Sequence, residues 1–214
     1  LATILALHTS PQSHQTASAI EAALTFLQQG AEKWADLSID NLPVATEMIL
    51  PRLLHEAQFA GLAIDPRPYA ALFKLHDRKC QQIQQMKPKA GSAPTYSWEA
   101  WGQTVTSPLF DSSGGIGHSP SATAAWLRQA KPVAGYSDLR EQGRRYLQKA
   151  SAATFPTTEI PGVVPNVWPI TGFERAYGPY ILLSTGLFHH PFFHDVINAQ
   201  ARELATIIQR GNGV

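Results

Sequence analysis

A neutral amide stands between two prolines in Pro165-Asn166-Val167-Trp168-Pro169, just before a helical pattern that includes Thr171. Proline rings fix the backbone, so this segment could hold one polar side chain at a set position inside an apolar cavity. Chemistry on an apolar substrate would use such a group. The alternative interpretation is a rigid loop that leads into a helix.

A glycine-rich turn, Gly114-Gly115-Ile116-Gly117, precedes a second candidate segment, His118-Ser119-Pro120-Ser121. Ser119 suits a helix N-cap, and Pro120 suits the first helical position. The segment superficially resembles the nucleophile elbow of a serine hydrolase. In that motif the residue after the nucleophile lends its backbone N–H to the oxyanion hole. Pro120 has no N–H, and no strand-like run precedes the turn, so we do not expect a serine hydrolase.

Composition excludes several classes of protein. The chain has 214 residues, of which 15% are charged and 44% hydrophobic, and its formal net charge is +1. Without a basic block, nucleic-acid binding and anionic-membrane binding are not expected. The single Cys80 excludes an internal disulfide and a cysteine-cluster metal site. No apolar stretch would span a bilayer, and we expect a cytoplasmic domain. The low charge also suggests that part of its surface is covered by another surface.

Helical periodicity dominates the elements that would position these segments. Alternating strand patterns are nearly absent, and no repeat at fixed spacing is evident. We therefore predict one all-α domain of about eight helices in antiparallel pairs, which can curl into an α/α barrel. Pro51 should bend or break the second helix, and residues 155–169 should be extended. The predicted helices cover residues 16–34, 44–59, 65–86, 97–102, from 119 onwards, 137–152, and two segments near the C-terminus.

Two further groups of residues have the types that bind metals. His190 and His194 are four residues apart, but Pro191 places His190 at or before a helix start, and no Glu follows it. We therefore interpret this segment as a helix entry and predict no metal site in the chain. Asp36 and Asp40 are too few for a confident metal site, and an N-cap role is preferred.

Several of these motifs together resemble the γ domain of class II terpene cyclases of the copalyl diphosphate synthase type. The resemblance covers essentially the whole chain, with the motifs in matching order. The start of the chain, residues 1–8, resembles the segment through which such enzymes enter the γ domain. The three motifs that carry the resemblance are Thr46-Glu47-Met48-Ile49-Leu50-Pro51, Ser119-Pro120-Ser121-Ala122-Thr123-Ala124, and Pro165-Asn166-Val167-Trp168-Pro169 with Phe173-Glu174 behind it.

This resemblance implies an α-barrel γ domain, residues 1–214, that forms the cyclisation cavity together with a β domain. In the family, an Asp-x-Asp-Asp motif of the β domain protonates the terminal alkene of an isoprenoid diphosphate. No two aspartates are adjacent in this chain, so the general acid is missing and we expect the isolated chain to be inactive. Magnesium is expected for the complete enzyme, but not bound by this chain alone. The expected reaction, of isomerase or lyase type, converts geranylgeranyl or farnesyl diphosphate into a bicyclic diphosphate such as copalyl diphosphate.

The resemblance also assigns catalytic roles. A carbocation is acidic enough to lose its proton to a positioned water, and Asn166 matches the family asparagine that helps hold this water. A family histidine is its partner, in His-Ser-Leu-Glu-Gly. Here Tyr96-Ser97-Trp98-Glu99-Ala100 is the comparable stretch, with Tyr96 at the histidine position. A tyrosine there could mean another water arrangement, another deprotonation site or a hydroxylated product. Alternatively, Tyr96 only packs.

The resemblance also predicts which residues contact the substrate. Lys79, with Arg78 beside it, stands near the position of a family lysine that holds the diphosphate, although such a side chain can also be simply solvated. Trp98 and Trp168 are the aromatic candidates for the cavity wall, because aromatic faces stabilise cations. Trp101 and Trp126 could also contribute, but tryptophans are more often core residues.

Two functional hypotheses therefore remain. The first is a γ domain that needs its β partner and an isoprenoid diphosphate. The second is a non-catalytic helical protein-interaction module. An exposed apolar area on one side would favour the first hypothesis, and a closed polar surface would favour the second.

Overall fold

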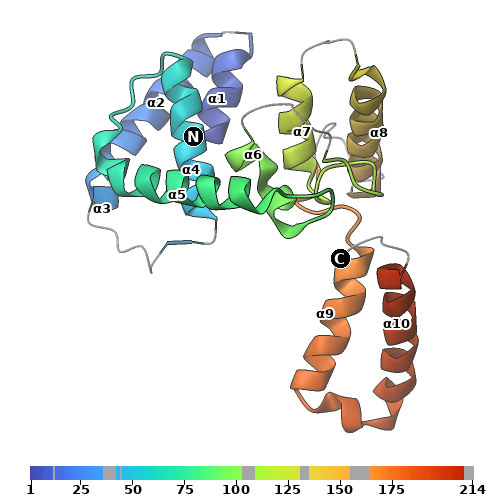
Figure 1. The fold of residues 1–214 in the computed structure, drawn as a ribbon. Coiled ribbons are helices and arrows are strands. Elements are labelled where there is room, and N and C mark those ends of the chain that lie inside the picture. Colours follow the sequence, from blue (N-terminus) through green and yellow to red (C-terminus); the bar gives the residue numbers. More distant parts are fainter. Residues whose placement is uncertain are drawn as a thin grey trace. The chain divides into compact units, whose positions relative to one another are not determined.

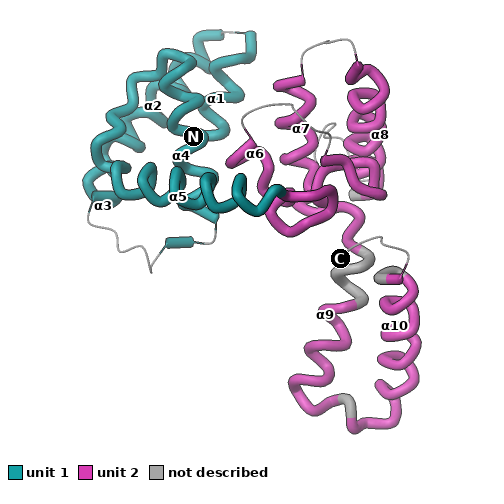
Figure 2. The backbone as a smooth tube through the Cα atoms, viewed as in Figure 1, with its two compact units in different colours: residues 1–87 teal, residues 88–214 magenta. Residues whose placement is uncertain are grey.

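The structure, a computed structural model, describes residues 1–11, 13–35, 42–43, 45–102, 109–130, 135–154 and 164–209. Within these ranges every regular element is a helix, and pairing of extended backbone is limited to isolated bridges from Ile116 to Phe110 and Ser119. The prediction of an all-α fold is confirmed. Figure 1 shows the helices, and Figure 2 shows two compact units, Leu1–Lys87 and Pro88–Val214. Asp36 and Asp40, for which an N-cap role is predicted in preference to a metal site, lie outside the described ranges.

The described part of the first unit contains six helical elements. They are α1 (Ala2–Thr9), α2 (His14–Gly30), α3 (Glu32–Ala35), α4 (Thr46–Phe59), the 3-10 helix η2 (Arg67–Tyr69) and α5 (Ala70–Met86). Ser13 caps α2 by accepting a hydrogen bond from the Thr16 N–H at 3.1 Å. Helix α1 was not among the predicted elements; its Ile4 is buried in a cluster with Ile20, Ala57 and Leu62.

Pro51 does not end α4, contrary to the expected break. The helix continues from Thr46 to Phe59, and Pro51 is fully buried on its inner side. Only one helical hydrogen bond is lost at a proline, and α4 retains buried contacts on both sides of it through Met48 and Leu54. Packing of this apolar stripe therefore outweighs the local defect.

The second unit contains η3 (Ala93–Ser97), α6 (Trp98–Trp101), α7 (Pro120–Gln129), α8 (Ser137–Thr154), α9 (Thr171–Ser184), η4 (Leu187–His189) and α10 (Pro191–Gln209). Helix α7 packs on α6 and α8. Helices α9 and α10 pack on one another as a hairpin closed by η4 (Figure 1).

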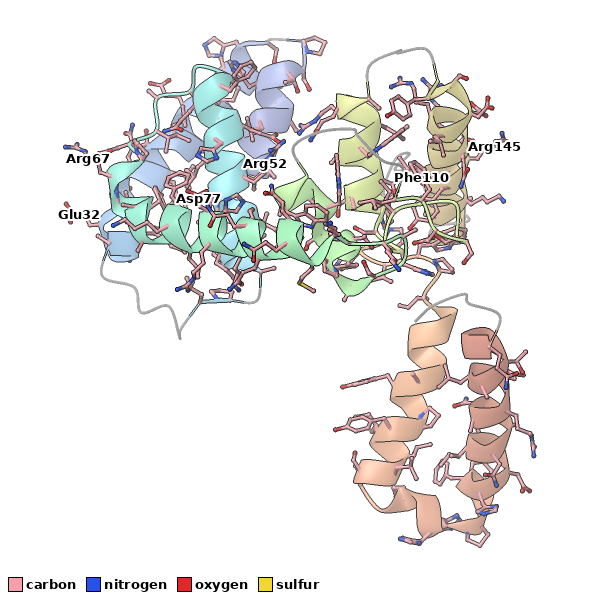
Figure 3. The ribbon with its side chains drawn as sticks, in the orientation of Figure 1. Glu32, Arg52, Arg67, Asp77, Phe110 and Arg145 are labelled. Carbon is pink, nitrogen blue, oxygen red and sulfur yellow. The ribbon has the colours of Figure 1, made fainter. Side chains whose placement is uncertain are left out.

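Trp126 occupies the core between α7 and its neighbours. Its indole is 1% exposed and lies edge-on to Phe110 at 4.9 Å and to Tyr136 at 5.8 Å, measured between ring centroids. Figure 3 shows Phe110 beside α7. This aromatic cluster fixes the start of the loop that follows Phe110, and that loop carries the candidate site.

No helix in the described part of the chain is both long enough and apolar enough to cross a membrane.

Candidate functional site

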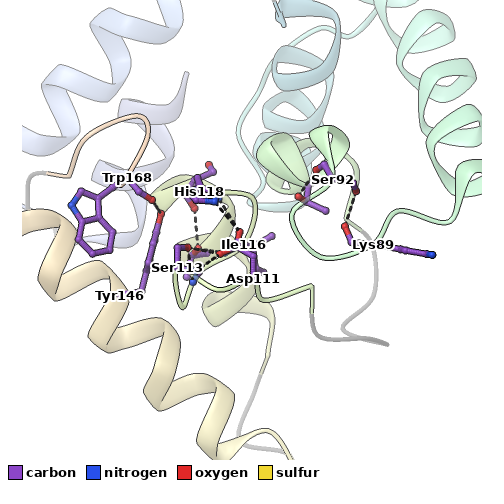
Figure 4. Close-up of polar contacts among 12 residues, drawn as sticks. Lys89, Ser92, Asp111, Ser113, Ile116, His118, Tyr146 and Trp168 are labelled. Carbon is purple, nitrogen blue, oxygen red and sulfur yellow. Dashed lines mark hydrogen bonds and ion pairs between the residues drawn. The ribbon is translucent and has the colours of Figure 1, made fainter. Parts of the chain in front are cut away.

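Asp111 organises the glycine-rich loop between Phe110 and α7. One carboxylate oxygen accepts hydrogen bonds from the N–H of Ser113 at 2.8 Å and from the Ser113 hydroxyl, and the other accepts from the N–H of His118 at 3.2 Å. The His118 imidazole lies 4.0 Å from the same carboxylate. Figure 4 shows this network. A largely buried carboxylate with three donors holds a loop of small residues in one conformation.

The loop passes directly into the capped N-terminus of α7. Ser119 is fully buried, and its hydroxyl accepts from the N–H of Ala122 at 3.2 Å. The Thr123 hydroxyl donates to the Ser119 carbonyl at 2.9 Å and accepts from the Ile116 N–H at 2.9 Å. Ser119 is therefore a structural cap, because a nucleophile must be reached by its substrate.

Trp168, in the proline-flanked segment, is held by its backbone on two sides. Its N–H donates to the His118 carbonyl at 2.9 Å, and its carbonyl accepts from the Tyr146 hydroxyl at 2.6 Å. The rings of Tyr146 and Trp168 also meet edge-on at 5.2 Å (Figure 4). Burial, and secondarily the charge of Asp111, raise the pKa of the Tyr146 phenol, so the hydroxyl remains a donor at neutral pH.

Asn166 precedes Trp168, with its two backbone hydrogen bonds, by two residues, and the Asn166 side chain is exposed. The hydrogen bonds of Trp168 to His118 and Tyr146 therefore hold the chain two residues beyond Asn166. The exposed amide does not lie in an enclosed apolar cavity of the described residues. A role in chemistry remains a prediction.

Tyr96 lies next to the same loop. Gly117 adopts a φ of +57°, and a Cβ atom placed on it would lie 2.5 Å from the carbonyl carbon of Thr95 and closer still to the backbone nitrogen of Tyr96. The η3 backbone and the loop therefore touch at a point where only glycine fits. The Tyr96 side chain is 44% exposed. The loop thus contacts the Tyr96 segment at Gly117 and the Asn166 segment at His118.

Glu99 shares the short helix α6 with Trp98. One of its carboxylate oxygens accepts from the Ser121 hydroxyl at 2.7 Å, and the other is buried without a hydrogen-bond partner in the described structure. Burial raises the pKa of Glu99, and the bond from Ser121 only partly opposes this effect. Ser121 connects Glu99 to the α7 cap, because its hydroxyl also lies 3.0 Å from that of Ser119.

The tryptophans occupy different environments. Trp98 is 3% exposed and lies under Gly102, where a Cβ would clash with several atoms of the indole. Trp101 donates to the Pro94 carbonyl at 2.7 Å, and Trp126 is in the core. Trp168 alone among these four is half-buried. Its ring is therefore the best placed of the four to meet a ligand.

Lys79 and Arg78 belong to the first unit. The Lys79 ammonium lies 2.5 Å from the carboxylate of Glu47, and Arg78 is exposed. Burial would raise the pKa of Glu47, but the hydrogen bond from Lys79, a backbone hydrogen bond and the charge of Lys79 together lower it. Glu47 lies in the Thr46–Pro51 motif noted in the sequence, so the ion pair connects that motif to Lys79, the residue predicted to bind the diphosphate.

No three His, Cys, Asp or Glu side chains that could hold a metal ion come together among the described residues. His190 accepts from the Phe192 N–H at 3.3 Å, as expected of a helix entry. A cavity of about 460 Å³ between α1 and α2, lined by residues that include His8, Ile20 and Leu24, contains none of the predicted site residues.

Asp111 and Tyr146 were missed from the sequence, and His118 was part of a candidate segment but was given no role of its own. Asp111-Ser112-Ser113-Gly114 has the composition of a turn in which aspartate caps backbone N–H groups, and this signal could have identified Asp111. Nothing local predicts that Tyr146, on α8, reaches Trp168, because that contact joins residues far apart in the sequence.

Similarity to known proteins covers essentially the whole chain. It is 38% identical over 227 residues to (+)-kolavenyl diphosphate synthase of Herpetosiphon aurantiacus, a match covering 100% of this chain and 43% of that protein. Uncharacterised proteins of Sinorhizobium fredii and Bradyrhizobium diazoefficiens are 36% and 35% identical, over 41% and 39% of their lengths. The chain thus spans about two fifths of these relatives. No family model matches it.

Proposed function

We propose that this chain is the γ domain of a class II diterpene cyclase. The observation that carries the proposal is the 38% identity, over the full chain, to a (+)-kolavenyl diphosphate synthase of which the chain covers 43%. That relative's name gives a product that retains its diphosphate. Such a product agrees with cyclisation started by protonation of an alkene, in which the diphosphate does not leave.

In the proposed reaction, a β domain corresponding to part of the relative outside the match supplies the general acid. The acid protonates the terminal alkene of geranylgeranyl or farnesyl diphosphate, and the polyene closes to a bicyclic cation. The γ domain then contributes the group that orients the water to which the cation loses its proton. The product is a bicyclic diphosphate, and from geranylgeranyl diphosphate it is one such as copalyl or kolavenyl diphosphate.

Asn166 is proposed to hold this water. The Asn166 amide can donate a hydrogen bond to a water molecule and accept one from it. The two hydrogen bonds of the Trp168 backbone hold the segment nearby, which reduces the entropy lost when the water is bound. Tyr96 is proposed as the second polar group, because its segment meets the same loop at Gly117. Its phenol can donate or accept a hydrogen bond, so it can replace the family histidine in orienting water.

Lys79, with Arg78 beside it, is proposed to contribute to diphosphate binding. The ammonium is already paired with Glu47 at 2.5 Å, so a diphosphate would compete with that carboxylate or share the lysine with it. Trp168 and Trp98 are proposed for the cavity wall, and the 3% exposure of Trp98 limits it to support from beneath. Magnesium is proposed for the complete enzyme only. No group of three or more His, Cys, Asp or Glu side chains that could hold it comes together among the described residues.

The test is a chimera in which this chain replaces the matched segment of the Herpetosiphon synthase. The chimera receives geranylgeranyl diphosphate and magnesium, and the dephosphorylated products are identified by gas chromatography and mass spectrometry. A bicyclic alcohol absent from reactions of the isolated chain supports the proposal. A folded chimera that leaves the substrate unchanged contradicts it.

A further inference from the structure

His118 combines an uncommon backbone conformation with a side chain that can take part in proton transfer. Its φ is +55°, close to the +57° of the neighbouring Gly117. A residue with a Cβ atom is strained in this left-handed region, so glycine would be the less costly residue at position 118 as well. Strained residues of this kind occur preferentially at functional sites. The imidazole of His118 is therefore a candidate functional group.

The His118 imidazole is partly exposed and can bind water. Its Nε2 lies 4.0 Å from the Asp111 carboxylate, and its side chain is 21% exposed, against 6% for Asp111 (Figure 4). A separation of 4.0 Å is too long for a hydrogen bond, and neither ring nitrogen makes one to another residue that the structure describes. A neutral imidazole has one nitrogen that accepts a hydrogen bond. That nitrogen can therefore accept one from a water molecule.

The glycine-rich loop places His118 between the two segments proposed to orient the water. Gly117, directly before it, lies against the backbone of Tyr96. The His118 carbonyl accepts a hydrogen bond from the Trp168 N–H at 2.9 Å, and Asn166 stands two residues before Trp168. Two residues of extended chain span at most about 7 Å. Position 118 is therefore next to the Tyr96 segment on one side and to the Asn166 segment on the other.

We propose that the His118 imidazole accepts the proton that the water takes from the bicyclic cation. This inference rests on the proposed function. A C–H bond of the cation breaks, its electron pair becomes the second bond of the new alkene, and the proton passes through the water to the ring nitrogen. The water is regenerated and the imidazole becomes an imidazolium. Transfer to the ring matters because a hydronium ion left beside the new alkene could protonate it again.

Asp111 is well placed to stabilise the imidazolium. Its side chain is nearly buried, and opposite charges 4.0 Å apart attract one another more strongly there than in water. The same carboxylate oxygen also accepts a hydrogen bond from the His118 N–H at 3.2 Å, which keeps the two residues together. The exposed part of the ring allows the proton to leave to solvent after the product is released.

Rescue by free imidazole tests this role. His118→Gly is made in the chimera with the Herpetosiphon synthase. Glycine adopts a φ of +55° without strain and keeps the backbone groups that bind Asp111 and Trp168. We expect the rate of bicyclic product formation to fall at least about hundredfold, and added imidazole to raise it again at least about tenfold. The restored rate should increase with the unprotonated fraction of the added imidazole, because only that form accepts a proton.

Two further variants complete the test. Lys87→Gly is the matched control, because Lys87 is exposed and has a φ of +48°; its rate should stay within about twofold of wild type, with or without imidazole. His118→Asn is the second variant at the site, since asparagine tolerates the left-handed region but its amide is no base, and we expect the same loss as for His118→Gly. If the chimera does not fold, the same variants are tested with the remaining portion of the synthase added as a separate chain.

The outcomes separate this inference from the proposed function. Folded His118→Gly and His118→Asn proteins that form the product at the wild-type rate would overturn the inference alone. A loss that imidazole does not restore would also overturn it, because His118 would then act only on the shape of the loop. A folded wild-type protein that leaves the substrate unchanged would refute the proposed function, and this inference with it.

Discussion

Replacing Gly117 with alanine tests the contact that joins the two halves of the candidate site. Gly117 has a φ of +57°, and a Cβ there would lie 2.5 Å from the Thr95 carbonyl carbon and 2.7 Å from its hydroxyl oxygen. Alanine in the left-handed region costs about 1–2 kcal/mol. Overpacking adds about 1–3 kcal/mol, at the upper end here because the nearest atoms belong to backbone. We expect a total loss of about 3–5 kcal/mol in the free energy of unfolding.

Two glycines of the same loop separate these contributions. Gly114 also has a positive φ, +87°, but its nearest neighbour would be the flexible Gln142 side chain at 3.8 Å. Gly114→Ala should therefore cost about 1–2 kcal/mol, from backbone strain alone. Gly115 has no positive φ, but a Cβ would meet the Tyr146 ring at 2.6 Å, so Gly115→Ala measures a clash without strain.

Urea denaturation followed by circular dichroism gives the three differences, provided that the slope of free energy against urea is unchanged. We expect Gly117→Ala to be less stable than Gly114→Ala by about 2 kcal/mol, which corresponds to about 4–8 °C in melting temperature for a chain of this size. Equal losses for Gly117→Ala and Gly114→Ala would refute the close approach of η3 to the loop, and with it the joint placement of Tyr96 and Asn166.

Three further substitutions test the hydrogen bonds and ion pairs around the site. Tyr146→Phe removes the donor to the Trp168 carbonyl and should lower the free energy of unfolding by about 1–2 kcal/mol in urea denaturation; unchanged stability would mean that the bond does not hold the segment. Because the pKa of Glu99 is raised in the folded state, the wild-type protein loses stability as the pH rises through and above 4.5. Glu99→Gln should therefore raise the melting temperature relative to wild type more at pH 7 than at pH 4. A difference that does not depend on pH would argue against a buried carboxylate. The lowered pKa of Glu47 acts in the opposite sense, since the ion pair with Lys79 stabilises the folded state only while Glu47 is charged. Glu47→Gln should lower the free energy of unfolding by up to about 1 kcal/mol at pH 7, a small amount because Lys79 is partly exposed. This loss should disappear as the pH falls below 4, and a loss that persists there would exclude the ion pair as its cause.

The helices could be predicted from the sequence because their signals are local. Ser119 caps α7 as its position before Pro120 indicates, and the apolar periodicity located α2, α4, α5 and α8 to within a few residues. Pro51 shows the limit of such rules. A proline defect in the middle of a helix was overcome by packing on both sides of it, and packing cannot be read from neighbouring residues.

The candidate site could be predicted only in part. Asn166 stood out because flanking prolines are a local signal. Its support by Tyr146 and His118 comes from elements that folding brings together, and no spacing in the sequence encodes this. The resemblance to class II cyclases supplied the roles of Asn166 and Tyr96, and these roles stay predictions until product analysis.

The measurement that tests the central claim most directly is the product profile of the chimera carrying Asn166→Ala, with Gln58→Ala, an exposed amide on α4, as the control. If Asn166 holds the water that accepts the proton, Asn166→Ala abolishes the wild-type bicyclic product or diverts it to another alcohol. The Gln58→Ala chimera should give the wild-type product. An unchanged product from a folded Asn166→Ala chimera would contradict the account.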